Sequence, residues 1–209
     1  MSVGSLRREY RGEPLDEDSA ASDPLEQFTR WFEQARATEA DPTAMTLATA
    51  TLDGRPSARM VLLKGFDARG FVFYTNYDSR KAGEIDATHR AALLFYWASL
   101  DRQVRIEGAI ARASEAESDA YFASRPLESR WSAHASPQSR AIDSRESLEA
   151  AVARVRAEFG DDVPRPAGWG GFRVVPDAFE FWQGRENRLH DRLSYVRDAG
   201  LWRRQRLAP

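Results

Sequence analysis

The sequence predicts a mainly β fold of the α+β class, an antiparallel barrel with helices around its outside. Short segments of strand character follow one another through hairpin turns, of which Asp53-Gly54 is the strongest signal. Three or four segments with apolar residues at helical spacing interrupt the seven to nine expected strands. No GxGxxG motif follows a strand and no P-loop motif is present, which disfavours parallel dinucleotide and nucleoside-triphosphate folds.

The N-terminal residues 1–22 are polar and lack periodicity, so we expect a flexible segment ahead of one domain over residues 23–209. The first helix should begin at Asp23, a good N-cap, with Pro24 at the first helical position and Glu26 two residues later. The apolar stripe that this helix would bury in the core consists of Leu25, Phe28, Trp31, Phe32 and Ala35.

Strand character dominates the next part of the chain. The expected strands cover residues 43–52, 57–64, 71–75, 91–98 and 103–113, with a turn over residues 66–70. Between the third and fourth strands, Asp78 or Ser79 can cap a short helix that carries Arg80 and Lys81 in its first turn. Cations there oppose the helix dipole, and an anion bound at that N-terminus would account for them.

The C-terminal half should contain two helices and then only strands. Ser114-x-x-Glu117 is a capping box that opens a helix to residue 123, and a second helix capped near Ser144 should reach Phe159. A polar loop is expected over residues 125–140 and a turn-rich linker over residues 164–171. The remaining strands are expected over residues 172–175, 179–183, 188–197 and 201–207.

The segment from Arg188 to Arg192 is the least ordinary of these strands. Side chains alternate along a strand, so Arg188, His190 and Arg192 should share one face. Two guanidinium groups beside an imidazole would suit an anion or a cofactor. A charged edge strand that stays exposed would show the same pattern, so the residues alone leave both interpretations open.

Composition excludes several classes of function. The net charge of -2 argues against a general nucleic-acid binder, and the absence of cysteine removes disulfides and thiolate chemistry. The three histidines are widely spaced, so no metal site is expected. Neither a membrane-length apolar run nor a signal peptide is present, so a soluble, cytoplasmic protein without membrane partners is expected.

Short motifs spread over nearly the whole chain resemble the pyridoxine/pyridoxamine 5'-phosphate oxidases, flavoproteins of the FMN-binding split-barrel class. Each motif is weak alone, but their order along the chain is specific. They are Arg7-Arg8-Glu9-Tyr10, Asp41-Pro42-Thr43-Ala44-Met45, Arg59-Met60-Val61-Leu62-Leu63-Lys64, Phe73-Tyr74-Thr75-Asn76, Ser79-Arg80-Lys81, Arg102-Gln103-Val104, Ser124-Arg125-Pro126, Gln138-Ser139, Trp169-Gly170-Gly171-Phe172, Glu180-Phe181-Trp182-Gln183-Gly184, Arg188-Leu189-His190-Asp191-Arg192 and Arg206-Leu207-Ala208-Pro209.

The resemblance implies a homodimer that binds FMN at the subunit interface. It implies oxidation of pyridoxine or pyridoxamine 5'-phosphate to pyridoxal 5'-phosphate, by hydride transfer to FMN and reoxidation by O2. The products would include peroxide, and ammonia from the amine. The alternatives are another split-barrel flavin oxidase, such as a phenazine-biosynthesis relative, or a non-catalytic carrier of FMN or pyridoxal phosphate.

The resemblance also assigns site residues, with Arg188 and His190 as the catalytic pair. The residues implied to bind FMN are Arg59, Met60, Val61, Leu62, Leu63, Lys64, Tyr74, Thr75, Arg80, Lys81, Gln103, Gln138, Ser139, Trp182 and Arg192. The residues implied to bind substrate are Arg7, Arg8, Glu9, Tyr10, Lys64, Tyr121, Arg125, Ser129, Arg188, Leu189 and His190, of which residues 7–10 would fold over the site as a lid.

Three points stay open in these assignments. Arg59 and Lys64 are an odd number of residues apart, so a regular strand would point them to opposite faces, and the assignment needs a bulge, a strand end or two subunits. His134 occupies a position where the family usually has tryptophan, which weakens the assignment of Gln138 and Ser139. His190 could accept a proton or only donate a hydrogen bond.

Overall fold

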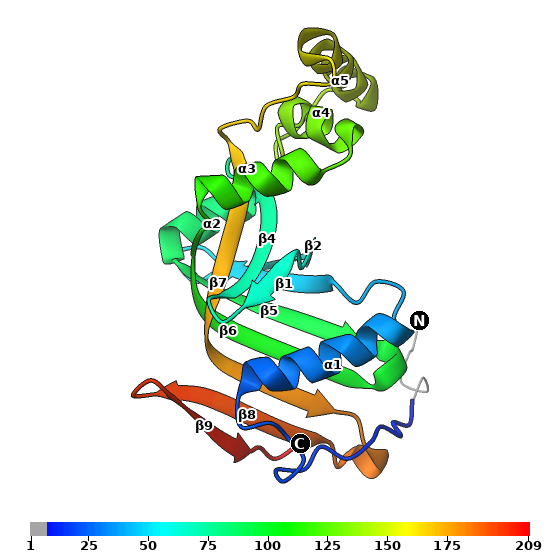
Figure 1. Cartoon of the computed structure of the whole chain (residues 1–209), viewed down its shortest axis with the longest axis vertical. Coiled ribbons are helices and arrows are strands. Elements are labelled where there is room, and N and C mark those ends of the chain that lie inside the picture. Colours follow the sequence, from blue (N-terminus) through cyan, green and yellow to red (C-terminus); the bar gives the residue numbers. More distant parts are fainter. Residues whose placement is uncertain (1–7) are drawn as a thin grey trace.

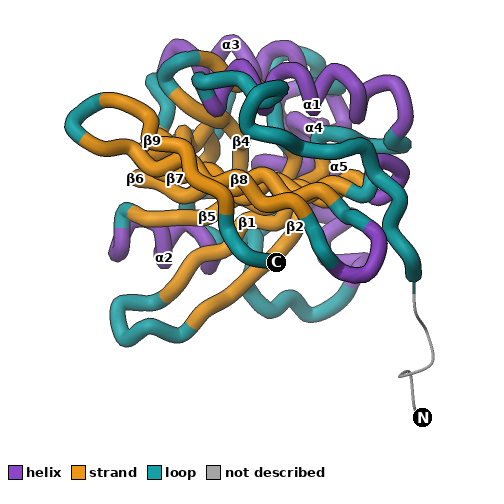
Figure 2. The backbone as a smooth tube through the Cα atoms, turned by 90° about the horizontal axis from the view of Figure 1, so that it is seen from below, coloured by secondary structure: helices purple, strands orange, loops and turns teal. Residues whose placement is uncertain are grey.

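A curled antiparallel sheet of nine strands forms the centre of the molecule, and helices lie around its outside (Figure 2). The computed structural model describes residues 8–209, so Arg7 lies outside the described residues. The strands are β1 (Ala44–Ala50), β2 (Pro56–Leu62), β3 (Gly65–Asp67), β4 (Gly70–Asn76), β5 (Arg90–Trp97), β6 (Arg102–Arg112), β7 (Trp169–Gln183), β8 (Asp191–Asp198) and β9 (Leu201–Arg206). The helices are α1 (Pro24–Thr38), α2 (Arg80–Thr88), α3 (Glu115–Ser124), α4 (Leu127–Ala135) and α5 (Arg145–Phe159), with 3-10 turns η1 (Ala98–Leu100) and η2 (Glu186–Arg188).

The strand order β2-β1-β5-β6-β7-β4-β3 is antiparallel at every pairing, and β8 and β9 extend the sheet from β7. The mainly β architecture with helices outside is therefore confirmed. No helix in the described part of the chain is long and apolar enough to cross a membrane.

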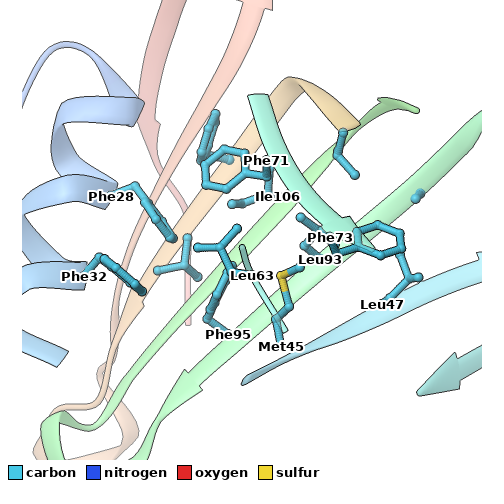
Figure 3. Close-up of a cluster of buried hydrophobic side chains, with 14 of the residues drawn as sticks. Phe28, Phe32, Met45, Leu47, Leu63, Phe71, Phe73, Leu93, Phe95 and Ile106 are labelled. Carbon is cyan, nitrogen blue, oxygen red and sulfur yellow. The ribbon is translucent and has the colours of Figure 1, made fainter. Parts of the chain in front are cut away.

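Helix α1 closes one side of the main core. Asp23 caps it by accepting from the backbone N–H groups of Leu25 and Glu26, as predicted. The rings of Phe28 and Phe32 point from α1 toward the strands (Figure 3), and the Phe28 ring centroid lies 4.9 Å from that of Phe71. Burial of this apolar stripe stabilises the helix on the sheet.

Helix α4 was not predicted, because residues 127–135 were expected to form a loop. The serines of residues 125–140 suggested a loop, but five of the nine residues 127–135 are Leu, Glu, Arg or Ala, which favour a helix. Trp131 is buried, and its indole Nε1 donates to the carbonyl of Gly160 at 2.8 Å. Local propensity and the burial of one aromatic side chain therefore both favour this helix.

The strand β7 corrects two further expectations, because residues 169–183 form one strand instead of a linker and two strands. The stretch between the two expected strands holds a β-bulge: Glu107 of β6 pairs with Ala178 and Gly108 pairs with Pro176, so Asp177 is the extra residue. Gly108 is needed at this place because a Cβ atom there would lie 2.0 Å from the carbonyl oxygen of Val175.

The described part of the N-terminal segment, residues 8–22, contains no helix or strand and runs along β8 and β9. Leu15, Ala20 and Ala21 are buried, and Arg206 of β9 pairs with Glu17 at 2.5 Å. The division of the chain at residue 22 and the flexibility of this segment stay predictions.

Candidate functional site

A cavity of about 500 Å³ is lined by residues of β2, β4, β7, α2, α3 and α4. The lining residues are Met60, Val61, Leu62, Lys64, Tyr74, Thr75, Lys81, Tyr121, Arg125, Pro126, Ser129, Gln138 and Trp169. All except Pro126 and Trp169 were predicted to bind the cofactor or the substrate. Residues that are up to 109 positions apart in the chain thus face one space, and both predicted groups contribute to it.

Lys64 reaches this cavity because strand β2 ends at Leu62. It lies between β2 and β3, and its backbone N–H donates to the carbonyl of Val72 at 2.8 Å. Lys64 therefore lies beyond the regular strand. The alternation of faces along β2 does not determine where its side chain points relative to that of Arg59. Of the three arrangements left open by the sequence, a strand end is the one found.

Lys81 lies in the first turn of α2, and its Nζ atom is surrounded by oxygen acceptors. It donates to Thr75 Oγ1 at 3.0 Å, Ser79 Oγ at 3.1 Å and Gln138 Oε1 at 2.6 Å. Burial, and then the charge of Arg59, lower the pKa of Lys81 to about 8. An anion bound beside Lys81 would stabilise its charged form, so this end of the cavity suits a phosphate.

Arg59 and Arg80 do not line the cavity but meet at a buried carboxylate beside it. Arg59 Nη2 lies 3.3 Å from Glu84 Oε2, and Arg80 Nε donates to Glu84 Oε1 at 2.9 Å. Sequence reasoning did not select Glu84. The spacing of Arg80 and Glu84, four residues apart on one helix, is the signal that could have found it.

Arg125 lines the same cavity and is held among aromatic rings. Its guanidinium carbon lies 4.6 Å from the Trp169 ring centroid, and Tyr74 and Tyr121 stack at 3.9 Å. Burial lowers the pKa of Arg125. Its buried Nη1 atom has no hydrogen-bond partner within residues 8–209. An unpaired buried donor on a cation is costly unless a ligand satisfies it, so this atom fits an anionic ligand.

Three other residues of this region have different surroundings. Leu63, predicted to bind FMN, is buried in the main core, and Ser139 is exposed outside the cavity lining. His134 packs near Phe122 and Phe159, and its Nε2 atom lies 2.6 Å from the carbonyl of Pro164. His134 therefore serves helix packing, while Gln138 still reaches the cavity.

The C-terminal residues form a second group, and the predicted strand over residues 188–192 is wrong. Strand β8 begins at Asp191, and Arg188 lies in η2 with φ of 61°. Arg188, His190 and Arg192 therefore do not line one strand face. The chain turns here because Asn187 and Arg188 both adopt left-handed backbone conformations, which local alternation of residue types does not reveal.

His190 is fixed by a hydrogen bond and by aromatic contacts. Its Nδ1 atom accepts from the backbone N–H of Arg185 at 3.1 Å, and its ring centroid lies 4.7 Å from that of Trp182. Burial, and then the charge of Arg188, lower the pKa of His190. The neutral ring therefore carries its proton on Nε2, which makes that atom a hydrogen-bond donor.

The N-terminal segment packs over this second group. Tyr10 lies edge-on to Trp182 and His190, with ring centroids 5.4 Å from each. A Cβ atom at Gly184 would lie 2.7 Å from Tyr10, so glycine is needed for this approach. A small cavity of about 190 Å³ is lined by Arg8, Glu9, Tyr10, Arg185, Asn187 and Arg188.

Gln103, Trp182 and Arg192 lie directly opposite one another on β6, β7 and β8. The buried carboxylate of Glu180 accepts from Arg192 Nε at 2.8 Å and so orients that guanidinium. Leu189 projects from the same region and is 69% exposed, which is unusual for a leucine of a folded domain.

Most of the described residues that were predicted to form the site thus fall into two separate groups, and the predicted residues outside both are Leu63, Ser139, Arg59 and Arg80. The cavity group belongs to the part of the molecule where α3 and α4 lie, and η2 lies at the opposite end of the long axis (Figure 1). Within residues 8–209, no group of three or more His, Asp or Glu side chains could hold a metal ion.

Two family models match the chain. The model described as pyridoxamine 5'-phosphate oxidase matches residues 32–159. The model described as the pyridoxine 5'-phosphate oxidase C-terminal dimerisation region matches residues 169–209. The second match contains Trp182 and every predicted residue of the η2 and β8 region.

Curated relatives match over the full chain. A protein of Rubrobacter xylanophilus named pyridoxine/pyridoxamine 5'-phosphate oxidase is 61% identical over 209 residues, covering 99% of this chain and 96% of its own length. A Bordetella petrii protein of the same name is 57% identical over 211 residues and is covered completely.

Solved structures share the fold. PhzG from Burkholderia lata, solved with tetrahydrophenazine-1-carboxylic acid, has a TM-score of 0.89 and 35% identity, covering 95% of this chain and 99% of its own. A pyridoxamine 5'-phosphate oxidase-related, FMN-binding protein from Nostoc punctiforme has a TM-score of 0.71 and 17% identity, covering 90% and 100%. These likenesses confirm the predicted split-barrel fold.

Proposed function

The chain belongs to the pyridoxamine 5'-phosphate oxidase family, and we propose that it oxidises pyridoxine and pyridoxamine 5'-phosphates to pyridoxal 5'-phosphate with FMN and O2. The alcohol and O2 give the aldehyde and hydrogen peroxide. The amine consumes one water as well and releases ammonia. FMN, when bound, would supply the two-electron oxidation, and the protein supplies binding, orientation and electrostatics.

The observation that carries this proposal is that one cavity is lined by three cationic side chains, Lys64, Lys81 and Arg125. We assign Lys81, which lies with Thr75 and Gln138, to one phosphate site and Arg125 with Lys64 to the other. A reaction between a phosphorylated cofactor and a phosphorylated substrate needs two such sites. The unpaired Nη1 atom of Arg125 supports the assignment of one of them to a ligand.

At the cofactor end, the residues that would hold the FMN phosphate are Lys81, Gln138, Ser139 and Arg59. Met60, Val61 and Leu62 of β2 and Tyr74 and Thr75 of β4 line the same cavity, and Thr75 Oγ1 accepts a hydrogen bond from Lys81. At the substrate end, Lys64, Tyr121, Arg125 and Ser129 would hold the substrate phosphate. Fixing both phosphates would bring the reacting groups together, which is mainly a positioning task.

The second group of residues would come from a partner subunit. The match to a dimerisation region over residues 169–209 supports a homodimer. Met60, Leu62 and Tyr96 are 62%, 41% and 51% exposed in the single chain, which is expected for side chains that a partner covers. In the dimer, Arg188 and His190 of one subunit would face the cavity of the other, with Gln103, Trp182 and Arg192 beside them.

In this arrangement His190 would orient the substrate. Its Nδ1 atom already accepts from Arg185, so the neutral ring offers Nε2–H as a donor. Arg188 stays charged at every physiological pH and is therefore an anion or hydrogen-bond contact and a poor base. The segment from Arg8 to Tyr10 would close over the substrate, as its packing on Trp182 and His190 suggests.

A phenazine-type oxidase is the second candidate, because PhzG shares the fold at 35% identity. The compound bound in that PhzG structure is a carboxylic acid, so the two functions separate by ligand. Arg125 and Lys64, together with Tyr121 and Ser129, form a site with enough donors for a phosphate group, which favours the phosphorylated vitamers.

Purified full-length protein loaded with FMN provides the test. Incubation with pyridoxamine 5'-phosphate in air should give pyridoxal 5'-phosphate, peroxide and ammonia, while unphosphorylated pyridoxamine should react far more slowly. Bound flavin with no turnover of either phosphorylated vitamer would contradict the proposal and leave the phenazine-type oxidase or the carrier as the explanation.

A further inference from the structure

Glu84 is a carboxylate buried beside the end of the cavity that is proposed to hold the FMN phosphate. Its side chain is 5% exposed, and it lies on α2, one turn after Arg80 and Lys81. A carboxylate close to a phosphate repels it, so a negative charge at this place calls for an explanation.

Within the described residues, the side-chain partners of Glu84 are two hydroxyl groups and two guanidinium groups. Its Oε2 atom accepts from Thr49 Oγ1 and Ser57 Oγ, each at 2.5 Å, and lies 3.3 Å from Arg59 Nη2. Its Oε1 atom accepts from Arg80 Nε at 2.9 Å. Burial alone would raise the pKa of Glu84, but hydrogen bonds from Ser57, Thr49 and Arg80 outweigh burial and lower the pKa to about 2. Glu84 is therefore ionised at neutral pH.

Thr49 and Ser57, which donate to Glu84, also accept hydrogen bonds from Arg59. Thr49 Oγ1 and Ser57 Oγ each accept from the Arg59 guanidinium at 2.5 Å, and Arg59 Nη1 also donates to the carbonyl of Leu47 at 3.2 Å. The guanidinium of Arg59 is thus held by a network that ends on one carboxylate. Such a network fixes a rotamer that a long, flexible side chain would otherwise lose.

The charges also balance. Arg59, Arg80 and Lys81 are three cations, and Glu84 reduces their net charge to about +2, the complement of a phosphate monoester dianion. Without Glu84 the three cations would repel one another, and this repulsion would destabilise the protein when no ligand is bound.

We propose that Glu84 is the positioning residue of the cofactor-phosphate site, where its two oxygens hold Arg59 and Arg80 ready for the phosphate. This inference rests on the proposed function, because it takes FMN as the ligand. Glu84 touches neither cofactor nor substrate in this role and acts through the two arginines.

Binding of FMN and of riboflavin to the flavin-free protein tests the proposal, because riboflavin lacks the phosphate. Glu84→Gln keeps the size of the side chain and removes its charge. It should weaken FMN binding about tenfold or more, since hydrogen bonds to charged groups are lost, and change riboflavin binding by no more than about twofold. Quenching of flavin fluorescence gives both dissociation constants.

Asp86→Asn is the matched control. Asp86 lies on the same helix and pairs with Arg112 at 2.9 Å, away from the site, so the same change of charge there should leave FMN binding unchanged. If Glu84→Gln does not fold, Thr49→Val removes the hydroxyl shared by Glu84 and Arg59 and should weaken FMN binding in the same selective way.

Two results would overturn the proposal. FMN binding that is unchanged or tighter in Glu84→Gln would mean that the carboxylate only repels the phosphate. Equal losses for FMN and riboflavin would mean that Glu84 only ties α2 to the β1–β2 hairpin. Failure of the unaltered protein to bind FMN would instead refute the proposed function, and that outcome is distinct from both.

Discussion

Arg125 is the single side chain that most clearly indicates an anionic ligand, because it is charged, partly buried and incompletely paired. Its Nη1 atom has no partner within the described residues, and Trp169 and Phe122 provide only aromatic faces. A buried guanidinium with an unpaired N–H contributes little to the stability of the fold, since its contacts within the protein do not offset the free-energy cost of its desolvation. Its surroundings are explained by a ligand that carries negative charge.

Arg125→Ala should therefore raise KM for pyridoxamine 5'-phosphate by about 10- to 100-fold, the loss expected for one or two charge-assisted hydrogen bonds. FMN affinity should stay close to that of the unaltered protein. Steady-state kinetics on FMN-loaded enzyme measure the effect. Arg156→Ala, which removes an exposed arginine that also stacks on a tryptophan, is the control and should leave KM unchanged.

Lys81 makes FMN binding depend on pH. The pKa of Lys81 is about 8 in the unliganded protein, because burial and the charge of Arg59 disfavour its protonation. Only the protonated amine attracts the phosphate, so affinity should be level below about pH 8 and fall as pH rises further. Titrations of flavin fluorescence between about pH 7 and pH 9.5 measure this, and Lys81→Arg should remove the fall because arginine stays charged. An unaltered slope in Lys81→Arg would show that another group titrates.

His190 can be tested by separating its two potential roles. Gln keeps a hydrogen-bond donor but cannot serve as a base near neutral pH. If His190 acts through Nε2–H, His190→Gln should keep kcat within about tenfold and His190→Ala should lose more. Equal and severe losses in both variants would favour proton transfer instead.

At the scale of elements, sequence patterns were reliable where local and tertiary preferences agree. The caps at Asp23 and Ser114 and the hairpin at Asp53-Gly54 were predicted because each depends on contacts a few residues apart. Helix α4 was missed because the serines of residues 125–140 were given more weight than the helix-forming residues among them, and β7 was divided because its bulge at Asp177 depends on pairing with β6.

The candidate site shows the same division. Most residues of the cavity could be named from motifs, because the order of short motifs along the chain is specific. Glu84 and Glu180 were not selected, because each acts through arginines that the motifs do not pair with it, and only the spacing of Arg80 and Glu84 was visible in the sequence. The turn at Asn187 and Arg188 was not predicted, because both residues adopt positive φ although neither is glycine.

Helix α4 should depend on Trp131 for its stability. Trp131→Ala removes a buried indole and should lower the free energy of unfolding by about 3–5 kcal/mol. Trp131→Phe keeps most of the ring and loses the hydrogen bond to Gly160, which should cost about 1 kcal/mol. Urea unfolding at one fixed protein concentration measures both, and losses below about 1 kcal/mol in the alanine variant would contradict the assigned packing.

At the scale of the whole molecule, the two groups of predicted site residues lie apart in the single chain. The cavity with Lys81 and Arg125 lies toward α3 and α4, and the group with Arg188 and His190 lies near η2 (Figure 1). An isologous dimer would pair each cavity with the second group of the other subunit, which makes two complete sites. The proposed function depends on this paired arrangement.

Complementation between inactive subunits tests this arrangement most directly. Arg125→Ala disables the cavity group and Arg188→Ala disables the second group, and each variant alone should turn over pyridoxamine 5'-phosphate poorly at low substrate concentration. Co-expression of differently tagged subunits should form mixed dimers in which one site has both arginines. Random pairing then predicts recovery of about a quarter of the activity of the unaltered enzyme. Mixed dimers that form but regain no activity would show that each site is built within a single subunit.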